Sequence, residues 1–288
     1  MKLDLEQLAH LAGQIRRDVV RMISAAGSGH PGGALGAAEI FAALYGHEMH
    51  HSADNITDPG RDRFFLSNGH ICAAWYSVLA RVGYLEPAEL GSLRKMGSRL
   101  QGHPSREKWP EVVESSSGPL GQGLSVANGL ALANTLSGDR GRVYCLVGDG
   151  ELQEGIIWEA ILSASHYGLA DVTLIVSDND LQIDGAVSSV KGIQPLGAKF
   201  NSFGWHAVEI DGHDTEALIG AFAEARAEKS RPTAVIAETV MGRGVSFMEN
   251  LAKWHGACPS ADETAAALEE LGAAPGYTDY PPLQEVIR

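Results

Sequence analysis

Residues 142–185 read RVYCLVGDGELQEGIIWEAILSASHYGLADVTLIVSDNDLQIDG. Two short apolar runs lie in this stretch, residues 143–147 and 172–176, and each run stops at a polar cluster. Between the two runs, apolar residues recur at helical spacing, namely Ile156, Ile157, Ala160, Ile161 and Ala164. A strand, a helix and a second strand of these lengths predict a crossover that joins two parallel strands, each buried on both faces.

The two predicted strands end at Gly148-Asp149-Gly150 and at Ser177-Asp178-Asn179. The carboxyl ends of parallel strands share the edge where open α/β sheets bind ligands. Neighbouring strands are about 5 Å apart, so we expect Asp149 and Asn179 to converge there. A carboxylate and an amide oxygen beside a glycine-rich turn suit a hard cation that carries a phosphate. Glu151 and Glu154 fall in the predicted first helical turn, where the helix dipole favours acidic residues with or without a ligand.

Composition and charge restrict the class of protein. The chain has 288 residues, of which 44% are hydrophobic and 20% charged, as in globular proteins with a core of their own. We expect no membrane partner, because no apolar run approaches the roughly 18 residues of a membrane span, and the first residues do not resemble a targeting peptide. Three widely spaced cysteines favour a reducing cytoplasm over a disulfide framework. The net charge of −14 disfavours nucleic acid as a partner, so a phosphate ligand must be held locally.

The rest of the chain predicts more elements of the same kinds. Further strands are expected at residues 64–66, 205–210 and 233–237. Helices are expected at residues 4–26, 37–45, 71–82, 123–135 and 214–228, with irregular segments at 51–63 and 98–117. The acidic residues 261–288 predict a surface helix and a trailing arm. We therefore expect one α/β domain over residues 1–288, with a mostly parallel sheet and helices on both faces.

Four histidines lie beside glycine or proline in predicted loops: His30, His70, His103 and His255. A single histidine of this kind is more often a surface or packing residue, but four together suit proton transfer and oxyanion stabilisation on a polar substrate. Residues 118–123, GPLGQG, lack the spacing of the dinucleotide fingerprint. The glycines of this loop leave the main chain at a helix start uncovered by side chains, so that a ligand can approach it closely. A tight loop whose glycines serve only packing would have the same sequence.

Residues 47–51, HEMHH, match the H-E-x-x-H pattern of zinc proteases. That chemistry needs a regular helix and a third metal ligand. Here the predicted helix ends into a polar loop, so we interpret the match as a solvated end of a segment.

Taken together, these motifs resemble the N-terminal, diphosphate-binding domain of transketolase over about residues 5–256. The residues that carry the resemblance are Ser28-Gly29-His30-Pro31-Gly32-Gly33, Arg61-Asp62-Arg63-Phe64, Leu66-Ser67-Asn68-Gly69-His70, Gly102-His103-Pro104, the GPLGQG loop, Gly148-Asp149-Gly150-Glu151, Gln153-Glu154-Gly155, Asp178-Asn179 and Ile183-Asp184-Gly185. The spacing of Gly148-Asp149-Gly150 and Asn179 matches the general thiamine diphosphate signature, and the Gly-His-Pro pairs indicate the transketolase branch.

The resemblance implies a role for each matching residue. Asp149, Asn179 and the main-chain carbonyl of Leu181 would hold Mg²⁺ (or Ca²⁺), which bridges the diphosphate of thiamine diphosphate. The other cofactor contacts would come from His70, His255 and Gly150 at the diphosphate, Gly118 and Leu120 at the aminopyrimidine, and Ile183 at the thiazolium, with Glu151 as a further cofactor-binding residue. The catalytic set would be His30, His70, His103 and His255, of which His30 and His103 face the substrate hydroxyls. Glu154 and Glu159 match acidic residues of a subunit interface. The loop that precedes His255 is short, which sets this position apart from the family pattern.

The resemblance also implies a partner. In this family the glutamate that activates the aminopyrimidine, and the basic residues that grip the sugar phosphate, come from a pyrimidine-binding domain that follows this one. The chain ends at Arg288 without that domain. We therefore expect the N-terminal subunit of a split transketolase, a dimer of heterodimers with a separate C-terminal subunit, which transfers a two-carbon ketol unit from a ketose phosphate to an aldose phosphate.

Three alternatives stay open. The chain could be a subunit of another thiamine diphosphate enzyme, similar to 1-deoxyxylulose phosphate synthase or to a 2-oxo acid dehydrogenase, although the Gly-His-Pro pairs argue against both. It could be a cofactor-free, non-catalytic scaffold that kept the fold, although the four histidines, Asp149 and Asn179 argue against decay. A nicotinamide- or nucleotide-binding sheet is the simplest α/β interpretation, but the GPLGQG loop lacks the spacing that it needs.

Overall fold

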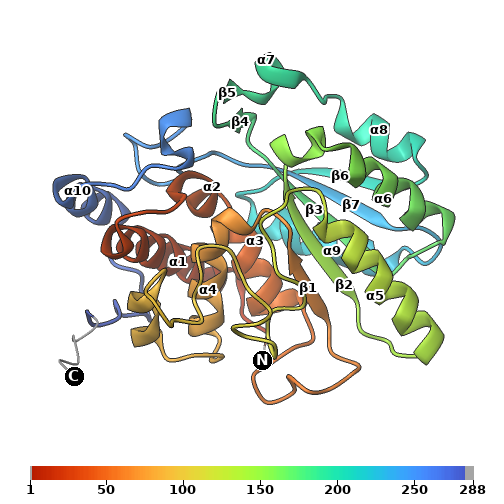
Figure 1. Ribbon diagram of the computed structural model, residues 1–288, viewed down its shortest axis with the longest axis horizontal. Helices are drawn as coiled ribbons and strands as arrows, with labels where there is room; N and C mark the ends of the chain where they lie inside the picture. Colours follow the sequence, from red (N-terminus) through yellow and green to blue (C-terminus); the bar gives the residue numbers. More distant parts are fainter. Residues whose placement is uncertain (1, 283–288) are drawn as a thin grey trace.

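Five parallel strands form the centre of the molecule, in the order β1-β2-β3-β7-β6 (Figure 1). The computed structural model describes residues 2–282 of the chain. The strands are β1 (Arg63–Leu66), β2 (Val143–Gly148), β3 (Val172–Asp178), β6 (His206–Asp211) and β7 (Thr233–Glu238). All five strands were predicted to within two residues at either end, and β2 and β3 are direct neighbours. Gly148 lies opposite Ser177 in the register of this pair, so the two polar termini adjoin, as expected.

Alternate residues of each strand feed two separate hydrophobic cores. On β2, Tyr144 and Leu146 point into one core, whereas Val143, Cys145 and Val147 point into the other. The same alternation continues on the neighbouring strands, because successive side chains of a strand face opposite sides of the sheet. Continuous apolar runs such as residues 143–147 are therefore explained by burial on both faces.

Helices cover both faces of the sheet, as the sequence predicted (Figure 1). One face is covered by α1 (Leu5–Ala26), α3 (Ala38–Ala43), α4 (Cys72–Arg81) and α9 (Thr215–Ala227). The other face is covered by α5 (Gly123–Ser137), α6 (Gly155–His166) and α8 (Leu196–Ser202). The chain reverses direction across the sheet between β6 and β7, and right-handed crossovers then place α9 on the face opposite to α6 and α8.

The segment around Pro31 differs from the prediction. We expected a break through residues 27–33 and one helix over residues 37–45. The structure has a short helix α2 (Pro31–Gly36), then α3, and then a π-helical turn, η1 (Leu44–Glu48). Proline is well tolerated at a first helical position. The glycines here serve close packing, since a Cβ at Gly32 would lie 2.5 Å from Cγ of Met241, and one at Gly36 would lie 2.8 Å from the carbonyl oxygen of Val240.

The sequence did not predict the elements between β3 and β6. Here the chain forms a small antiparallel hairpin of β4 (Leu181–Gln182) and β5 (Gly185–Ala186), followed by α7 (Val187–Lys191) and α8. Short 3₁₀ turns, also unpredicted, are η2 (Gly69–Ile71), η3 (Pro87–Ser92), η4 (Gly150–Gln153) and η5 (Ala252–His255). Because η4 separates β2 from α6, Glu151 lies in the first turn of η4, and Glu154 is the N-cap residue of α6. The prediction that both lie in the first turn of that helix is therefore wrong for Glu151, whereas Glu154 still adjoins the N-terminus of α6.

The acidic C-terminal segment begins with α10 (Ala261–Leu271), at the expected place. The residues after it pack against α1 instead of trailing away. Nη2 of Arg17 donates to Oδ2 of Asp279 at 2.7 Å, and the side chain of Tyr280 is buried. Residues 283–288 of the predicted arm lie outside the described part of the chain. Within residues 2–282, no helix combines the length and the apolar character that a membrane crossing requires.

Candidate active site

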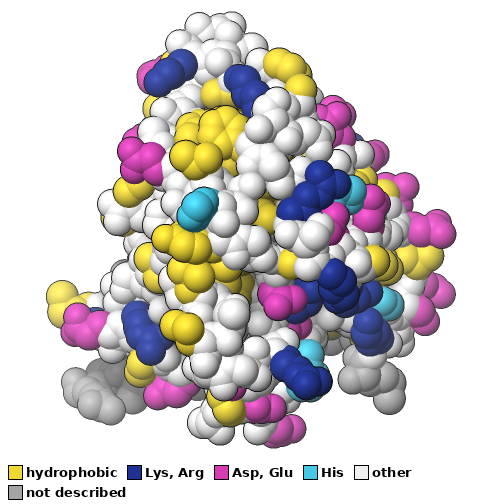
Figure 2. Space-filling view, turned by 90° about the vertical axis from the view of Figure 1, so that its right-hand side faces the viewer, with side chains coloured by type: hydrophobic (Ala, Val, Ile, Leu, Met, Phe, Trp, Pro, Cys, Tyr) yellow, Lys and Arg dark blue, Asp and Glu magenta, His cyan; other side chains and the backbone are white. Residues whose placement is uncertain are grey.

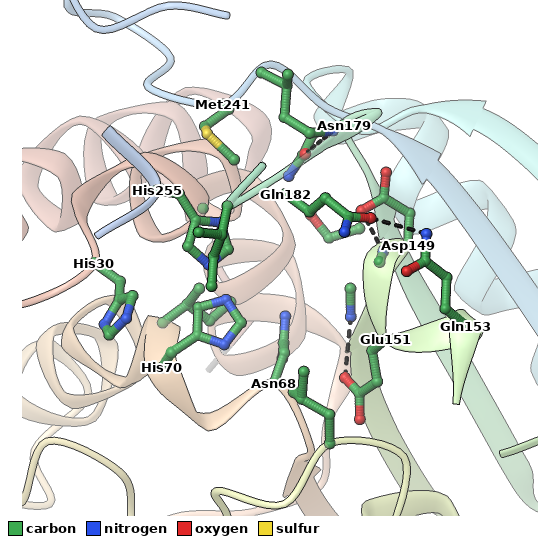
Figure 3. Close-up of a pocket in the computed structure, with 18 of the residues that line it drawn as sticks. His30, Asn68, His70, Asp149, Glu151, Gln153, Asn179, Gln182, Met241 and His255 are labelled. Carbon is green, nitrogen blue, oxygen red and sulfur yellow. Dashed lines mark hydrogen bonds between the residues drawn. The ribbon is translucent and has the colours of Figure 1, made fainter. Parts of the chain in front are cut away.

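A pocket of about 360 Å³ lies at the carboxyl edge of the sheet, where β2 and β3 end. Figure 3 shows residues from distant parts of the chain that line it, with Asp149 and Asn179 on the sheet side and His30, His70 and His255 across from them. Of the positions expected in the site, the residues that line the pocket are His30, His70, His103, Gly118, Leu120, Asp149, Gly150, Glu151, Glu154, Asn179, Leu181, Ile183 and His255. Only Glu159 lies elsewhere, exposed on α6.

The carboxylate of Asp149 is the part of this pocket best suited to a cation. Its side chain is only 2% exposed, and Oδ1 accepts from the backbone N–H of Gly150 at 2.8 Å. Oδ2 is buried and has no hydrogen-bond partner among the described residues. Burial, together with the negative charge of Asp178, raises the pKa of Asp149 to about 7. A divalent ion would supply the missing partner and the compensating charge, so the residues present fit a metal.

Asn179 and Leu181 complete the expected oxygen set. Oδ1 of Asn179 accepts from the backbone N–H of Leu181 at 2.9 Å, which fixes the end of the carboxamide that carries the oxygen. The described residues contain no cluster of three or more His, Cys, Asp or Glu side chains suited to a metal. A site here would therefore combine one carboxylate, one amide oxygen and one main-chain carbonyl, which are ligands that Mg²⁺ and Ca²⁺ accept.

The four expected histidines lie together along one side of the pocket. The ring of His30 is central, with centroids 5.2 Å from His70, 6.2 Å from His103 and 5.8 Å from His255. Burial lowers the pKa of His70 to about 3 and that of His30 to about 4, and at His30 the positive charge of Arg94 acts in the same direction. Burial also lowers the pKa of His103 and of His255, and Arg94 adds to the effect at His103. All four rings are thus neutral near pH 7, a state in which an imidazole can either accept or donate a proton.

Glu151 joins three segments that build the pocket. Its carboxylate is 2% exposed. Oε1 accepts from the backbone N–H of Gly121 at 2.7 Å and from the hydroxyl of Ser67, and Oε2 accepts from the backbone N–H of Gly148 at 3.3 Å. The turn after β2 is therefore tied to the GPLGQG loop and to the end of β1. The backbone of Gly121 has a positive φ of +84°, and a Cβ there would lie 2.9 Å from Cβ of Glu154.

The histidine-rich segment 47–51 contributes nothing to this pocket. Glu48 accepts from the hydroxyl of Tyr144 at 2.7 Å and is ion-paired with Arg226, while Nδ1 of His51 bonds to the hydroxyl of Tyr84. Glu48 is buried, so our interpretation of this segment as a solvated end is wrong at that residue.

Among the residues that line the pocket without a role assigned from the sequence are Asn68, Gln153, Gln182 and Met241. Oδ1 of Asn68 is buried and has no hydrogen-bond partner among the described residues. Asn68 and Gln153 lie in the same motifs as His70 and Asp149, and this proximity in the sequence could have predicted that they line the pocket. Gln182 and Met241 carried no such signal, because long-range packing brings them to the pocket.

A parallel α/β sheet with a carboxylate, an amide and four histidines gathered at its carboxyl edge is typical of a domain that binds a cofactor. Comparison with known proteins makes the assignment specific. Residues 8–286 match the family described as transketolase, thiamine diphosphate binding domain. The chain belongs to the transketolase family, as its N-terminal thiamine diphosphate-binding domain.

Individual relatives agree with this assignment. The chain is 40% identical to human transketolase over 253 residues, which cover 88% of this chain and 40% of that protein. It is 37% identical over 270 residues to one of the subunits of the apulose-4-phosphate transketolase of Actinobacillus succinogenes, covering 93% of this chain and 97% of the relative. Among solved structures, transketolase from Campylobacter jejuni superposes with a TM-score of 0.89 at 33% identity, covering 96% of this chain and 44% of that one. The chain thus spans about two fifths of the length of the full-length transketolases that it matches.

Proposed function

We propose that the chain is the N-terminal subunit of a two-chain transketolase, which transfers a two-carbon ketol unit from a ketose phosphate to an aldose phosphate in the cytoplasm. The observation that carries this proposal is the convergence on one pocket of four neutral histidines and Oδ2 of Asp149, which has no hydrogen-bond partner within residues 2–282. Family membership supports thiamine diphosphate as the cofactor.

Asp149, Asn179 and the carbonyl of Leu181 would hold Mg²⁺ against the diphosphate. A protein of net charge −14 cannot attract a diphosphate through its overall field, so the cation at Asp149 has to provide the attraction locally. Gly118 and Leu120 would meet the aminopyrimidine, and Gly150, His70 and His255 would contact the diphosphate, with Glu151 as a further cofactor-binding residue. Ile183 is 73% exposed on the β4–β5 hairpin, so its side chain is free to cover a thiazolium ring.

The histidines would move the protons of the reaction. Bound thiamine diphosphate would stabilise the carbanion character that develops when the two-carbon unit is detached from a ketose. Nδ1 of His30 is buried without a hydrogen-bond partner among residues 2–282. A neutral His30 or His103 ring can take a proton from a substrate hydroxyl and return it to the developing alkoxide, since both rings remain uncharged at pH 7.

A separate pyrimidine-binding chain would complete the site. The relative from Actinobacillus succinogenes supports this, because that protein is named as one of the subunits of a transketolase and matches this chain over almost its whole length. The partner would supply the activating glutamate and the phosphate grip. We expect the purified chain alone to show no ketol transfer.

Two such pairs would associate through α5 and α6. Figure 2 shows apolar side chains gathered down the middle of the face that carries these helices. The exposed apolar side chains on the two helices include Val126 and Leu136 of α5 and Ile156 and Leu162 of α6. Glu154 and Glu159 are exposed beside Ile156, where they would provide the acidic contacts of the interface. A large exposed apolar patch is typical of a surface that is covered in the assembled protein.

Co-purification with a candidate C-terminal chain, followed by thiamine diphosphate titration with Mg²⁺ and a ketol-transfer assay, tests the proposal. We expect cofactor binding and turnover only in the mixture, with a ketose phosphate as donor. Turnover of pyruvate in place of a ketose would instead favour the 1-deoxyxylulose phosphate synthase-like or 2-oxo acid dehydrogenase-like alternatives. Absence of thiamine diphosphate binding by the mixture would favour the cofactor-free, non-catalytic scaffold. Measurable ketol transfer by the chain on its own would overturn the two-chain proposal.

A further inference from the structure

The β4–β5 hairpin and α7 form a flap, residues 180–191, that covers one side of the pocket. This flap carries Leu181 and Ile183, the two positions expected to meet the metal and the thiazolium. Most of its side chains are exposed, and the one that reaches a hydrophobic core is Val187, which is 2% exposed. A segment with so little buried apolar surface depends on its hydrogen bonds to stay in place.

Part of the hydrogen bonding of the flap is internal. Asp180 accepts from the backbone N–H of Ser188 at 2.9 Å and from its hydroxyl at 3.0 Å, and its carbonyl accepts from the backbone N–H of Val187 at 3.0 Å. These bonds shape the flap, but they do not attach it to the rest of the domain.

Gln153, at the end of η4, attaches the flap to the sheet side. Its Nε2 donates to Oε1 of Gln182 at 2.8 Å and to the carbonyl oxygen of Lys191 at 2.9 Å (Figure 3 shows the first of these). Nζ of Lys191 returns a longer bond to the carbonyl oxygen of Gln153 at 3.4 Å. Gln153 therefore grips the flap at both ends, in β4 and in α7.

The carbonyl of Lys191 also fixes the orientation of this contact. A carbonyl oxygen accepts only a donor, so the amide nitrogen of Gln153 must face Lys191, and the same nitrogen then requires the oxygen of Gln182. Both N–H groups of Gln153 are used within the protein. The side chain of Gln153 therefore has no N–H left to donate to a ligand in the pocket.

We propose that Gln153 is a positioning residue for the cofactor, which fixes the flap so that the Leu181 carbonyl and the Ile183 side chain stand at the pocket. The proposal rests on the proposed function for the identity of that cofactor, but the attachment of the flap does not depend on it. Asp149 lies at the start of η4 and Gln153 at its end, so the same short turn connects the expected metal ligand to the residue that holds the flap.

Gln153→Met tests the proposal, because methionine keeps the length of the side chain and removes both donated bonds. Hydrogen exchange of the full-length chain should become about tenfold faster in peptides covering the flap and stay unchanged in β2 and β3. Gln182→Met removes only one of the two bonds and should have a smaller effect, about threefold. Gln7→Met is the matched control, since it removes the same group from the exposed start of α1, and it should leave the flap unchanged.

The cofactor arm uses the chain assembled with its C-terminal partner. There, Gln153→Met should weaken thiamine diphosphate binding about five- to tenfold at fixed Mg²⁺, whereas Gln7→Met should not. Unchanged flap exchange in Gln153→Met overturns the attachment, and faster exchange with unaltered cofactor affinity overturns the positioning role. If the assembled wild-type protein binds no thiamine diphosphate, the proposed function and the cofactor role of Gln153 both fail, whereas the exchange result still decides whether Gln153 attaches the flap.

Discussion

Replacing Glu151 by alanine should loosen the whole carboxyl edge of the sheet, even though the side chain has the sequence context of an ordinary helix-start glutamate. Its carboxylate accepts hydrogen bonds from Ser67, Gly121 and Gly148, which belong to three different segments. The substitution leaves these buried donors without an acceptor, and it also leaves a small cavity.

The size of the effect follows from two opposing contributions. Hydrogen bonds to a charged group each stabilise a protein by about 1.5 to 3 kcal/mol, and the bond to Gly148 is long at 3.3 Å, so the three together are worth about 5 kcal/mol. Burial raises the pKa of Glu151, which shows that the carboxylate is itself poorly solvated, and its removal returns part of that cost. We therefore expect a net loss of about 3 kcal/mol for Glu151→Ala. Glu151→Gln keeps an oxygen for Gly121 and Ser67 and should cost about 1 kcal/mol.

Urea unfolding of the chain at pH 7.5, followed by tryptophan fluorescence, measures both values. Glu107→Ala is the control, because that side chain is 85% exposed and should change the stability by less than about 0.5 kcal/mol. If Glu151→Ala lowers the free energy of unfolding by less than about 1 kcal/mol, or if the alanine and glutamine variants lower it equally, the carboxylate does not hold the three segments together.

Three further predictions concern neighbouring residues. Asp149→Asn should abolish Mg²⁺-dependent cofactor binding in the assembled enzyme and should stabilise the metal-free chain at pH 8 by about 1 to 3 kcal/mol, because it removes a buried charge; near-normal cofactor affinity in isothermal titration would contradict the metal role. The pKa of His70 is near 3 in the folded chain and 6.5 in the unfolded chain, so the unfolded state binds more protons and stability falls as the pH drops from 7 to 4.5. His70→Asn should make this fall in stability smaller by about 2 kcal/mol. Parallel pH–stability curves for variant and wild type would disprove this. Gly121→Ala should destabilise the chain by about 1 to 3 kcal/mol in urea unfolding, because alanine is strained at φ +84° and its Cβ would meet Glu154; wild-type stability would show that the loop can move aside.

The strands of the sheet and the edge that carries the site could be predicted from the sequence, because continuous apolar runs report burial on both faces directly. Asp149 and Asn179 lie where predicted because parallel strands share a carboxyl edge. The helix at Pro31–Gly36 was missed, because its glycines are required by close packing against Met241 and Val240, which are distant in the sequence. No local pattern announces such a contact.

The part of the site that escaped prediction depends on side-chain contacts between distant segments. Glu151 reads as a helix-start residue until the structure shows Ser67 and Gly121 next to it. The flap at residues 180–191 gave no periodic signal, since it is short and buries only Val187. Its attachment through Gln153 depends on how η4 is placed relative to α7, which the sequence alone does not reveal.

The alternation of side chains along β2 has a practical consequence for engineering this protein. A volume change at Leu146 acts first on the layer that contains α1, α3 and α4, whereas one at Cys145 acts first on the layer beneath α5 and α6. Heat tolerance could therefore be raised by repacking the first layer without disturbing the surface on which a second copy would dock. Substitutions in the second layer would instead act on α5 and α6, the helices of the proposed interface, and the same strand offers both kinds of change at adjacent positions.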